Sequence, residues 1–146
     1  SPNSTRPWQH VLEPLSGYLA LGEHLYTAKT LSGENFNFGP ISKHIHTVED
    51  ILNDLSKYWK IKDLTKAYKI TDNIKFHEAG LLKLNCDKAL FHLKWLPTLS
   101  HEQLIEFTGS WYYNFYNEQM NMLDYTLNQL DRYEQIAVDK KIQWAK

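Results

Sequence analysis

The sequence predicts a helix-rich α/β domain that occupies residues 1–146. Apolar residues recur at helical spacing in several long segments, which is the main signal for amphipathic helices. A few short apolar runs alternate instead, as Phe36 and Phe38 do, which is typical of strands. Aromatic residues make up 14% of the chain, so enough apolar material is present to form a packed core.

The first predicted helix starts around residues 12–14 and ends near Tyr26. Its expected buried face contains Leu15, Tyr18, Leu19, Gly22, Leu25 and Tyr26. A second helix begins after Thr47, because Asp50 three residues later completes a capping box. We expect its apolar stripe to enter the core; the stripe comprises Val48, Ile51, Leu52, Leu55, Tyr58 and Trp59.

Three short strands are predicted at residues 35–38, 64–70 and 81–84, and a short helix at residues 87–93. Ser100 with Gln103 opens a long helix to about Tyr116, and Thr126 with Gln129 opens a last helix to about Lys140. The aromatic face of the long helix is expected in the core; it comprises Leu104, Thr108, Trp111 and Phe115, flanked by Ile105 and Tyr112.

Composition excludes several classes of function. The net charge of −1 and the lack of a basic face argue against nucleic-acid binding. No apolar run approaches the length of a membrane span, and no secretory signal is evident. The single cysteine, Cys86, cannot form an internal disulfide, so we expect a soluble protein of the reducing cytoplasm. Cys86 itself is expected to be a small buried residue.

The segment before the first helix is the best candidate for a ligand site. Arg6 offers a planar fork of donors to a phosphate or a sugar hydroxyl, and Trp8 offers a flat apolar face. Gln9 carries a donor and an acceptor, and His10 stands just before the helix. The alternative is structural: Arg6 forms a surface ion pair, Trp8 fills the core, and His10 caps the helix.

This segment reads Arg-Pro-Trp-Gln-His-Val-Leu-Glu-Pro-Leu over residues 6–15, followed by Gly-Tyr-Leu at residues 17–19. It resembles the opening of the C-terminal part of the CDP-glucose 4,6-dehydratase family, in the extended short-chain dehydrogenase/reductase group. The similarity continues along nearly the whole chain, through shorter motifs that sister enzymes share. These are residues 36–40, 47–49, 77–79, 82–84, 87–89, 95–97 and 111–112, and the tail around Met122 and Thr126.

The resemblance implies the substrate-binding part of an NAD-dependent lyase that dehydrates CDP-glucose. It places Glu78 on the ribose hydroxyls and His77 near the pyrophosphate, together with Arg6, Trp8 and Gln9. The Rossmann half that binds NAD is absent here, because no glycines show the Gly-x-Gly-x-x-Gly spacing. Tyr58 and Lys62 match the group's Tyr-x-x-x-Lys only in spacing, at a predicted helix end, so no catalytic residue is assigned.

Other interpretations stay open. The alternatives are that the chain alone is a non-catalytic nucleotide-sugar-binding, structural or assembly module, or that it is part of a sister NAD-dependent nucleotide-sugar epimerase or dehydratase. Its apolar surfaces suit a missing cofactor half or a homodimer. His44 and His46 have the spacing of a metal pair, but no further ligand stands nearby, which favours a solvated loop and no metal site.

Overall fold

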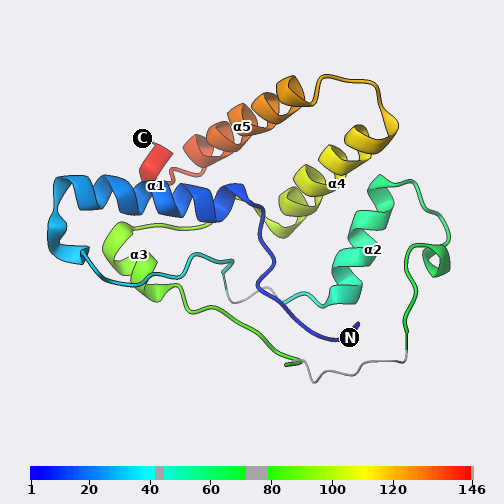
Figure 1. Ribbon diagram of the computed structural model, residues 1–146, viewed down its shortest axis with the longest axis horizontal. Helices are drawn as coiled ribbons and strands as arrows, with labels where there is room; N and C mark the ends of the chain where they lie inside the picture. Colours follow the sequence, from blue (N-terminus) through cyan, green and yellow to red (C-terminus); the bar gives the residue numbers. More distant parts are fainter. Residues whose placement is uncertain (42–44, 72–78, 146) are drawn as a thin grey trace.

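The computed structural model describes residues 1–41, 45–71 and 79–145. Its helices confirm the helix-rich character expected from the sequence (Figure 1). The longer elements are α1 (Leu12–Thr27), α2 (Val48–Tyr58), α3 (Asp87–Leu93), α4 (His101–Asn117) and α5 (Met122–Asp139). Short 3-10 turns complete the set: η1 (Lys29–Leu31), η2 (Leu64–Lys66) and η3 (Gln143–Ala145).

The bounds of α1 agree with the prediction, but its buried face does not. The helix buries Glu13, Ser16 and Gly17, while Tyr18 and Leu19 of the expected apolar face are largely exposed. The ring of Phe38 lies directly against Gly17, where it leaves no room for a Cβ atom. The predicted core face of α1 is therefore wrong, since the described part of the chain does not cover it.

Helices α2 and α4 pack side by side, and both begin with the predicted capping box. The Thr47 hydroxyl accepts from the Asp50 amide at 3.1 Å, and the Asp50 carboxylate accepts from the Thr47 amide at 2.8 Å. Ser100 and Gln103 form the equivalent pair on α4. Where the helices meet, a Cβ on Gly109 would come within 2.7 Å of the Tyr58 ring, so glycine permits the close approach.

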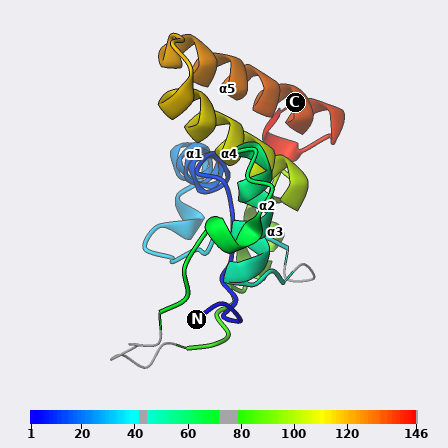
Figure 2. The same ribbon diagram turned by 90° about the vertical axis from the view of Figure 1, so that its right-hand side faces the viewer.

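Helices α4 and α5 form a hairpin that lies along one side of the molecule (Figure 2). Helix α5 begins at Met122, because Asn121 caps it by accepting from the Leu123 amide at 3.0 Å. The predicted start at Thr126 is therefore wrong: the Thr126 hydroxyl donates to the Met122 carbonyl inside the helix. The exposure of Phe115 also corrects the expectation that the aromatic face of α4 is core.

A hydrophobic core lies between α1, α3 and the C-terminal turn. Phe38, Ala89 and Trp95 are buried there, and the rings of Phe38 and Trp95 meet edge to face with centroids 5.0 Å apart. Trp144 of η3 packs against the same cluster, so the C-terminal end of the chain returns to α1. This core packs against α1 at Gly17, Ala20 and Leu21, and so anchors the helix that follows the candidate site.

The three predicted strands do not form. Residues 35–38 have no ladder partner, residues 64–66 form η2, and residue 81 forms only a single bridge. In the described residues, Thr5 alone makes bridges, one antiparallel to Thr47 and one parallel to Leu81. Isolated strands need neighbours for stability, and among the described residues these segments find no more than the single bridge to Leu81.

Candidate functional site

The N-terminal segment is pinned on both sides before it enters α1. The Thr5 amide donates to the Gly80 carbonyl at 2.8 Å, and the Leu82 amide donates back to Thr5 at 3.3 Å. On the other side, the Val48 amide donates to the Ser4 carbonyl at 2.9 Å. Three distant parts of the chain therefore meet at residues 4–6, and the residues that follow them are held in place.

Arg6 lies directly beside the segment that follows His77 and Glu78. Its Nη1 donates to the carbonyl of Ala79 at 3.0 Å and to the carbonyl of Thr5 at 2.7 Å. His77 and Glu78 themselves lie outside the described residues. The structure thus brings Arg6 next to the residue after Glu78, and the ligand roles of Arg6, His77 and Glu78 stay predictions.

Trp8 and Gln9 line one cavity of about 420 Å³. The Trp8 indole donates to the His46 carbonyl at 3.0 Å, and the Gln9 side-chain amide donates to the Phe38 carbonyl at 3.0 Å. The Gln9 Oε1 atom is buried and has no hydrogen-bond partner among the described residues. Because a buried acceptor without a donor is costly, Oε1 is a natural partner for a hydroxyl or amino group of a ligand.

The cavity has apolar walls and several polar side chains. Trp8, Ile41 and Leu104 contribute apolar surface, and the ionisable residues around it are His10, Glu13, His46, His101, Glu102 and Lys140. This mixture of flat apolar walls and separated polar groups is typical of sites for small organic ligands. Arg6 does not line this cavity.

Arg6 is nevertheless connected to this cavity through a shared wall. Pro40 and Ile41 border the 420 Å³ cavity, a small hollow beside Arg6, and a third cavity of about 470 Å³. Lys83 and Asn85 line that third cavity, which also shares Pro97 with the first. The hollows therefore follow one another around residues 40–41, an arrangement that suits an extended ligand better than a compact one.

A buried carboxylate holds the floor of the cavity. Glu13 is only 2% exposed, and its oxygens accept from the main-chain amides of Thr98 at 2.9 Å and Leu99 at 2.7 Å. The Tyr133 hydroxyl donates to the same carboxylate at 3.2 Å. Desolvation raises the pKa of Glu13, an effect that these hydrogen bonds and the nearby Lys140 oppose. Sequence reasoning did not select Glu13, because its partner Thr98 lies 85 residues further along the chain.

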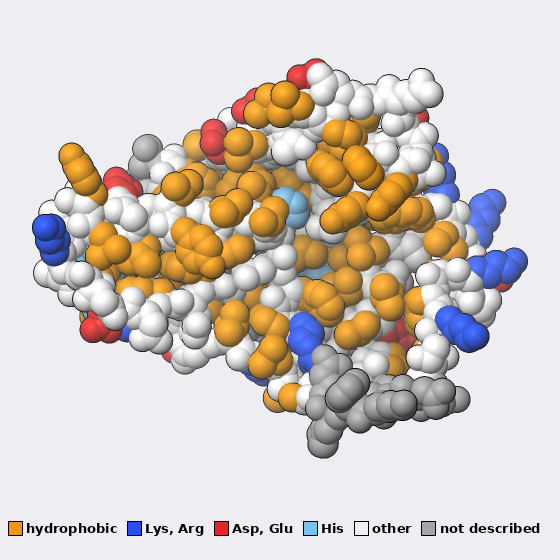
Figure 3. Space-filling model, viewed as in Figure 1, with side chains coloured by type: hydrophobic (Ala, Val, Ile, Leu, Met, Phe, Trp, Pro, Cys, Tyr) orange, Lys and Arg blue, Asp and Glu red, His pale blue; other side chains and the backbone are white. Residues whose placement is uncertain are grey.

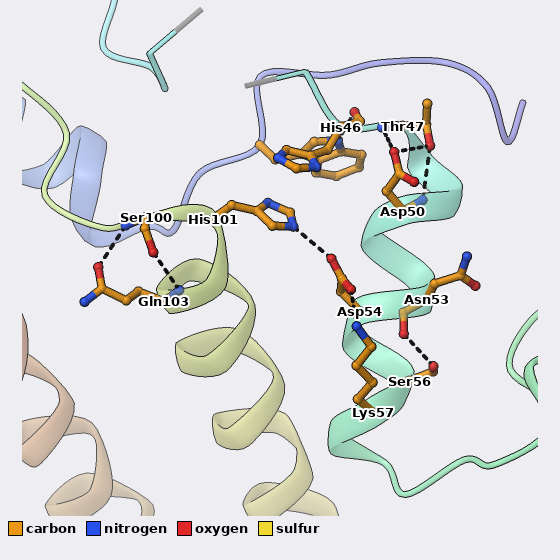
Figure 4. Close-up of polar contacts among 11 residues, drawn as sticks. His46, Thr47, Asp50, Asn53, Asp54, Ser56, Lys57, Ser100, His101 and Gln103 are labelled. Carbon is orange, nitrogen blue, oxygen red and sulfur yellow. Dashed lines mark hydrogen bonds and ion pairs between the residues drawn. The ribbon is translucent and has the colours of Figure 1, made fainter. Parts of the chain in front are cut away.

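Histidines form the other side of the cavity (Figure 4). His101 of α4 pairs with Asp54 of α2 across 2.9 Å, and the His46 ring stacks on the His101 ring with centroids 3.5 Å apart. Burial lowers the pKa of His10, which favours its neutral ring. The pairing of Asp54 with His101 joins positions 47 residues apart, so no local sequence pattern reveals it.

The remaining residues that the sequence analysis singled out are Tyr58, Lys62, Cys86, His44 and His46. Tyr58 is the last residue of α2 and packs at Gly109, and Lys62 lies beyond the helix, so the pair stands at the helix end that the sequence predicted. Burial raises the pKa of the Cys86 thiol, opposite to what a nucleophile needs. His46 stacks on His101, whereas His44 lies outside the described residues.

Within the described ranges, no helix has the length and apolar character to cross a membrane.

Comparison with known proteins gives one informative match. Over 97 residues, 66% of this chain, the sequence is 41% identical to the CDP-glucose 4,6-dehydratase of Salmonella typhimurium (strain LT2). The match covers 26% of that enzyme, so the chain spans about a quarter of the length of its curated relative. No protein-family model matches the chain. The similarity relates the chain to a nucleotide-sugar dehydratase over part of that enzyme's length.

Proposed function

We propose that this chain is the nucleotide-sugar-binding part of a CDP-glucose 4,6-dehydratase and lies C-terminal to a separate cofactor-binding half. The observation that carries the proposal is the 41% identity over 97 residues to an enzyme of that name. In that reaction, water is eliminated across C5 and C6 of the glucose and a 4-keto-6-deoxy sugar forms. NAD, when bound to such an enzyme, accepts and returns the hydride.

The cavity beside the N-terminal segment supports this assignment. Trp8 supplies a flat apolar wall, and Gln9 Oε1 accepts a hydrogen bond from a sugar hydroxyl or from the base. Arg6 borders the small hollow and donates to the carbonyl of Ala79, the residue that follows Glu78 in the sequence, so we assign this end of the connected hollows to the diphosphate and ribose. A carboxylate such as that of Glu78 can accept from two adjacent ribose hydroxyls.

The exposed face of α1 supports the existence of a second half. Val11, Leu15, Tyr18, Leu19 and Tyr26 are 45–92% exposed along this helix, and Figure 3 shows apolar side chains gathered over it. A contiguous apolar face of this kind is typical of an interface. The sequence has no Gly-x-Gly-x-x-Gly loop to hold a pyrophosphate, so we assign no residue of this chain to NAD.

Titration calorimetry with CDP, using UDP and GDP as comparisons, tests the proposal. We expect saturable CDP binding that weakens about fivefold in Gln9→Leu, since a hydrogen bond is worth on the order of 1 kcal/mol and a tenfold change needs about 1.4 kcal/mol. Gln135→Leu is the matched control, because Gln135 is an exposed residue of α5 that bonds Asp139. Circular dichroism checks that Gln9→Leu is folded, since Gln9 also holds the Phe38 carbonyl.

Two results would contradict the proposal. One is the absence of any binding heat at millimolar CDP, because the chain would then hold no preformed nucleotide site. The other is equal affinity of Gln9→Leu and Gln135→Leu for CDP, which places the ligand outside the cavity. A preference for UDP or GDP over CDP would instead reassign the chain to a sister enzyme with a different nucleotide sugar.

A further inference from the structure

One flank of α5 carries an apolar stripe that nothing in the described chain covers. It consists of Leu123, Leu127, Leu130 and Val138, which are between 36% and 66% exposed. Their spacing places them along one side of the helix, where Leu130 borders the face that buries Tyr133 and Ala137. We call these four residues the α5 stripe.

Aromatic side chains are also exposed on the other arm of the hairpin. Tyr112, Phe115 and Tyr116 near the end of α4 are between 46% and 69% exposed. Tyr112 and Tyr116 stack on each other, and Phe115 meets Tyr116 edge to face with centroids 5.0 Å apart. The Trp111 indole donates to Thr126 across the hairpin at 2.8 Å, which fixes the two arms relative to each other.

The hairpin is also strongly acidic. Residues 101–139 contain seven acidic side chains and one basic side chain, Arg132, for a net charge of −6, whereas the whole chain has a net charge of −1. Arg132 is itself paired with Glu106. Asp124, Asp131 and Glu134 stand on α5 beside or within the α5 stripe, and the nearest lysines along the chain come only at residues 140 and 141.

We propose that the α4–α5 hairpin is a docking surface for a basic amphipathic helix of a partner protein. The regular i, i+4, i+7 spacing of the α5 stripe presents a ridge against which another helix can pack. The acidic side chains complement a partner that is rich in lysine or arginine. A second copy docked hairpin to hairpin would bring two surfaces of charge −6 together, which electrostatic repulsion disfavours.

This surface is separate from the candidate ligand site and from the exposed face of α1. The α5 stripe does not line the cavity that holds Trp8 and Gln9. Figure 3 shows apolar side chains over the hairpin with acidic side chains along its outer border. The proposal therefore stands or falls independently of nucleotide-sugar binding.

The probe is a fluorescent 18-residue peptide of leucine and lysine in an amphipathic pattern, with a leucine and glutamate peptide of the same pattern as comparison. We expect saturable anisotropy changes with the lysine peptide only, and weaker binding as salt rises. The double variant Leu127→Gln with Leu130→Gln should bind at least tenfold more weakly, because both leucines lose apolar contact. Asp131→Asn with Glu134→Gln should weaken binding and reduce its dependence on salt.

Leu19→Gln is the matched control, since Leu19 is an exposed leucine on α1 rather than on the hairpin. Its affinity for the lysine peptide should stay within twofold of the unaltered chain. Equal weakening by Leu19→Gln, or equal binding of the glutamate peptide, would overturn the proposal. So would a dimer, detected by sedimentation, that Leu127→Gln dissociates, because the occupant would then be a second copy.

Discussion

Replacing Glu13 with glutamine tests how the floor of the cavity is held. The carboxylate is buried and accepts from the amides of Thr98 and Leu99 and from the Tyr133 hydroxyl. A glutamine side chain has the same shape but only one acceptor oxygen. Its NH2 group would therefore point at one of these donors, which would lose its acceptor. A buried donor that loses its acceptor costs about 1–3 kcal/mol, so Glu13→Gln should lower the free energy of unfolding by about 1–3 kcal/mol.

The assay is urea denaturation followed by tryptophan fluorescence, repeated from pH 4 to pH 8. Burial raises the pKa of Glu13 above its ordinary value of 4.5, so the folded state binds this proton more tightly than the unfolded state does. Its contribution to stability is therefore complete at low pH and is lost as pH rises from 4.5 through the raised pKa. Relative to Glu13→Gln, the unaltered chain should lose stability across that interval.

Glu23→Gln provides the control, because Glu23 is an exposed glutamate on the same helix. Its unfolding free energy should change by less than about 0.5 kcal/mol, as exposed substitutions usually do. The reasoning is refuted if Glu13→Gln is no more destabilising than Glu23→Gln. It is equally refuted if the difference between the unaltered chain and Glu13→Gln shows no dependence on pH.

Three further outcomes follow from the packing and caps. Gly109→Ala should lower the free energy of unfolding in urea by about 1–3 kcal/mol, because the added Cβ would strike the Tyr58 ring. Gly22→Ala should raise it by up to about 1 kcal/mol, because a Cβ there meets nothing within 4 Å. A Gly22→Ala chain less stable than Gly109→Ala would contradict this. Thr47→Ala should cost about 1 kcal/mol in the same assay by removing the cap of α2, and an unchanged midpoint would show that the cap is dispensable. The His10 ring should titrate below pH 6.5 by NMR, because burial disfavours its charged form, and a midpoint at or above 6.5 would contradict that burial.

Local hydrogen bonding explains which elements the sequence predicted well. The starts of α2 and α4 follow from Thr47 with Asp50 and from Ser100 with Gln103, since each capping box lies within four residues. The start of α5 was wrong because Asn121 supplies a cap without the glutamate or glutamine pattern that was sought. The strand at residues 35–38 failed because a strand depends on partners that the sequence pattern does not show.

The helical spacing of apolar residues also does not indicate which part of the protein covers an apolar face. Leu19 on α1 and Phe115 on α4 have the spacing of core residues, yet both are exposed in this chain. The same limit applies to the candidate site. Trp8 and Gln9 were predicted from a local motif, whereas the buried Glu13 and the Asp54–His101 pair depend on contacts between distant segments. Their placement required the fold.

The most direct test of the central claim is an NMR titration of the ¹⁵N-labelled chain with CDP-glucose. The account predicts saturable shifts of the Trp8 indole and Gln9 side-chain amide signals, which report on the cavity that both residues line. The Trp144 indole, which borders a different cavity, should stay unchanged and serves as the internal reference. Static Trp8 and Gln9 signals at saturating CDP-glucose, or shifts confined to Trp144, would contradict the assignment of this chain as the nucleotide-sugar-binding part.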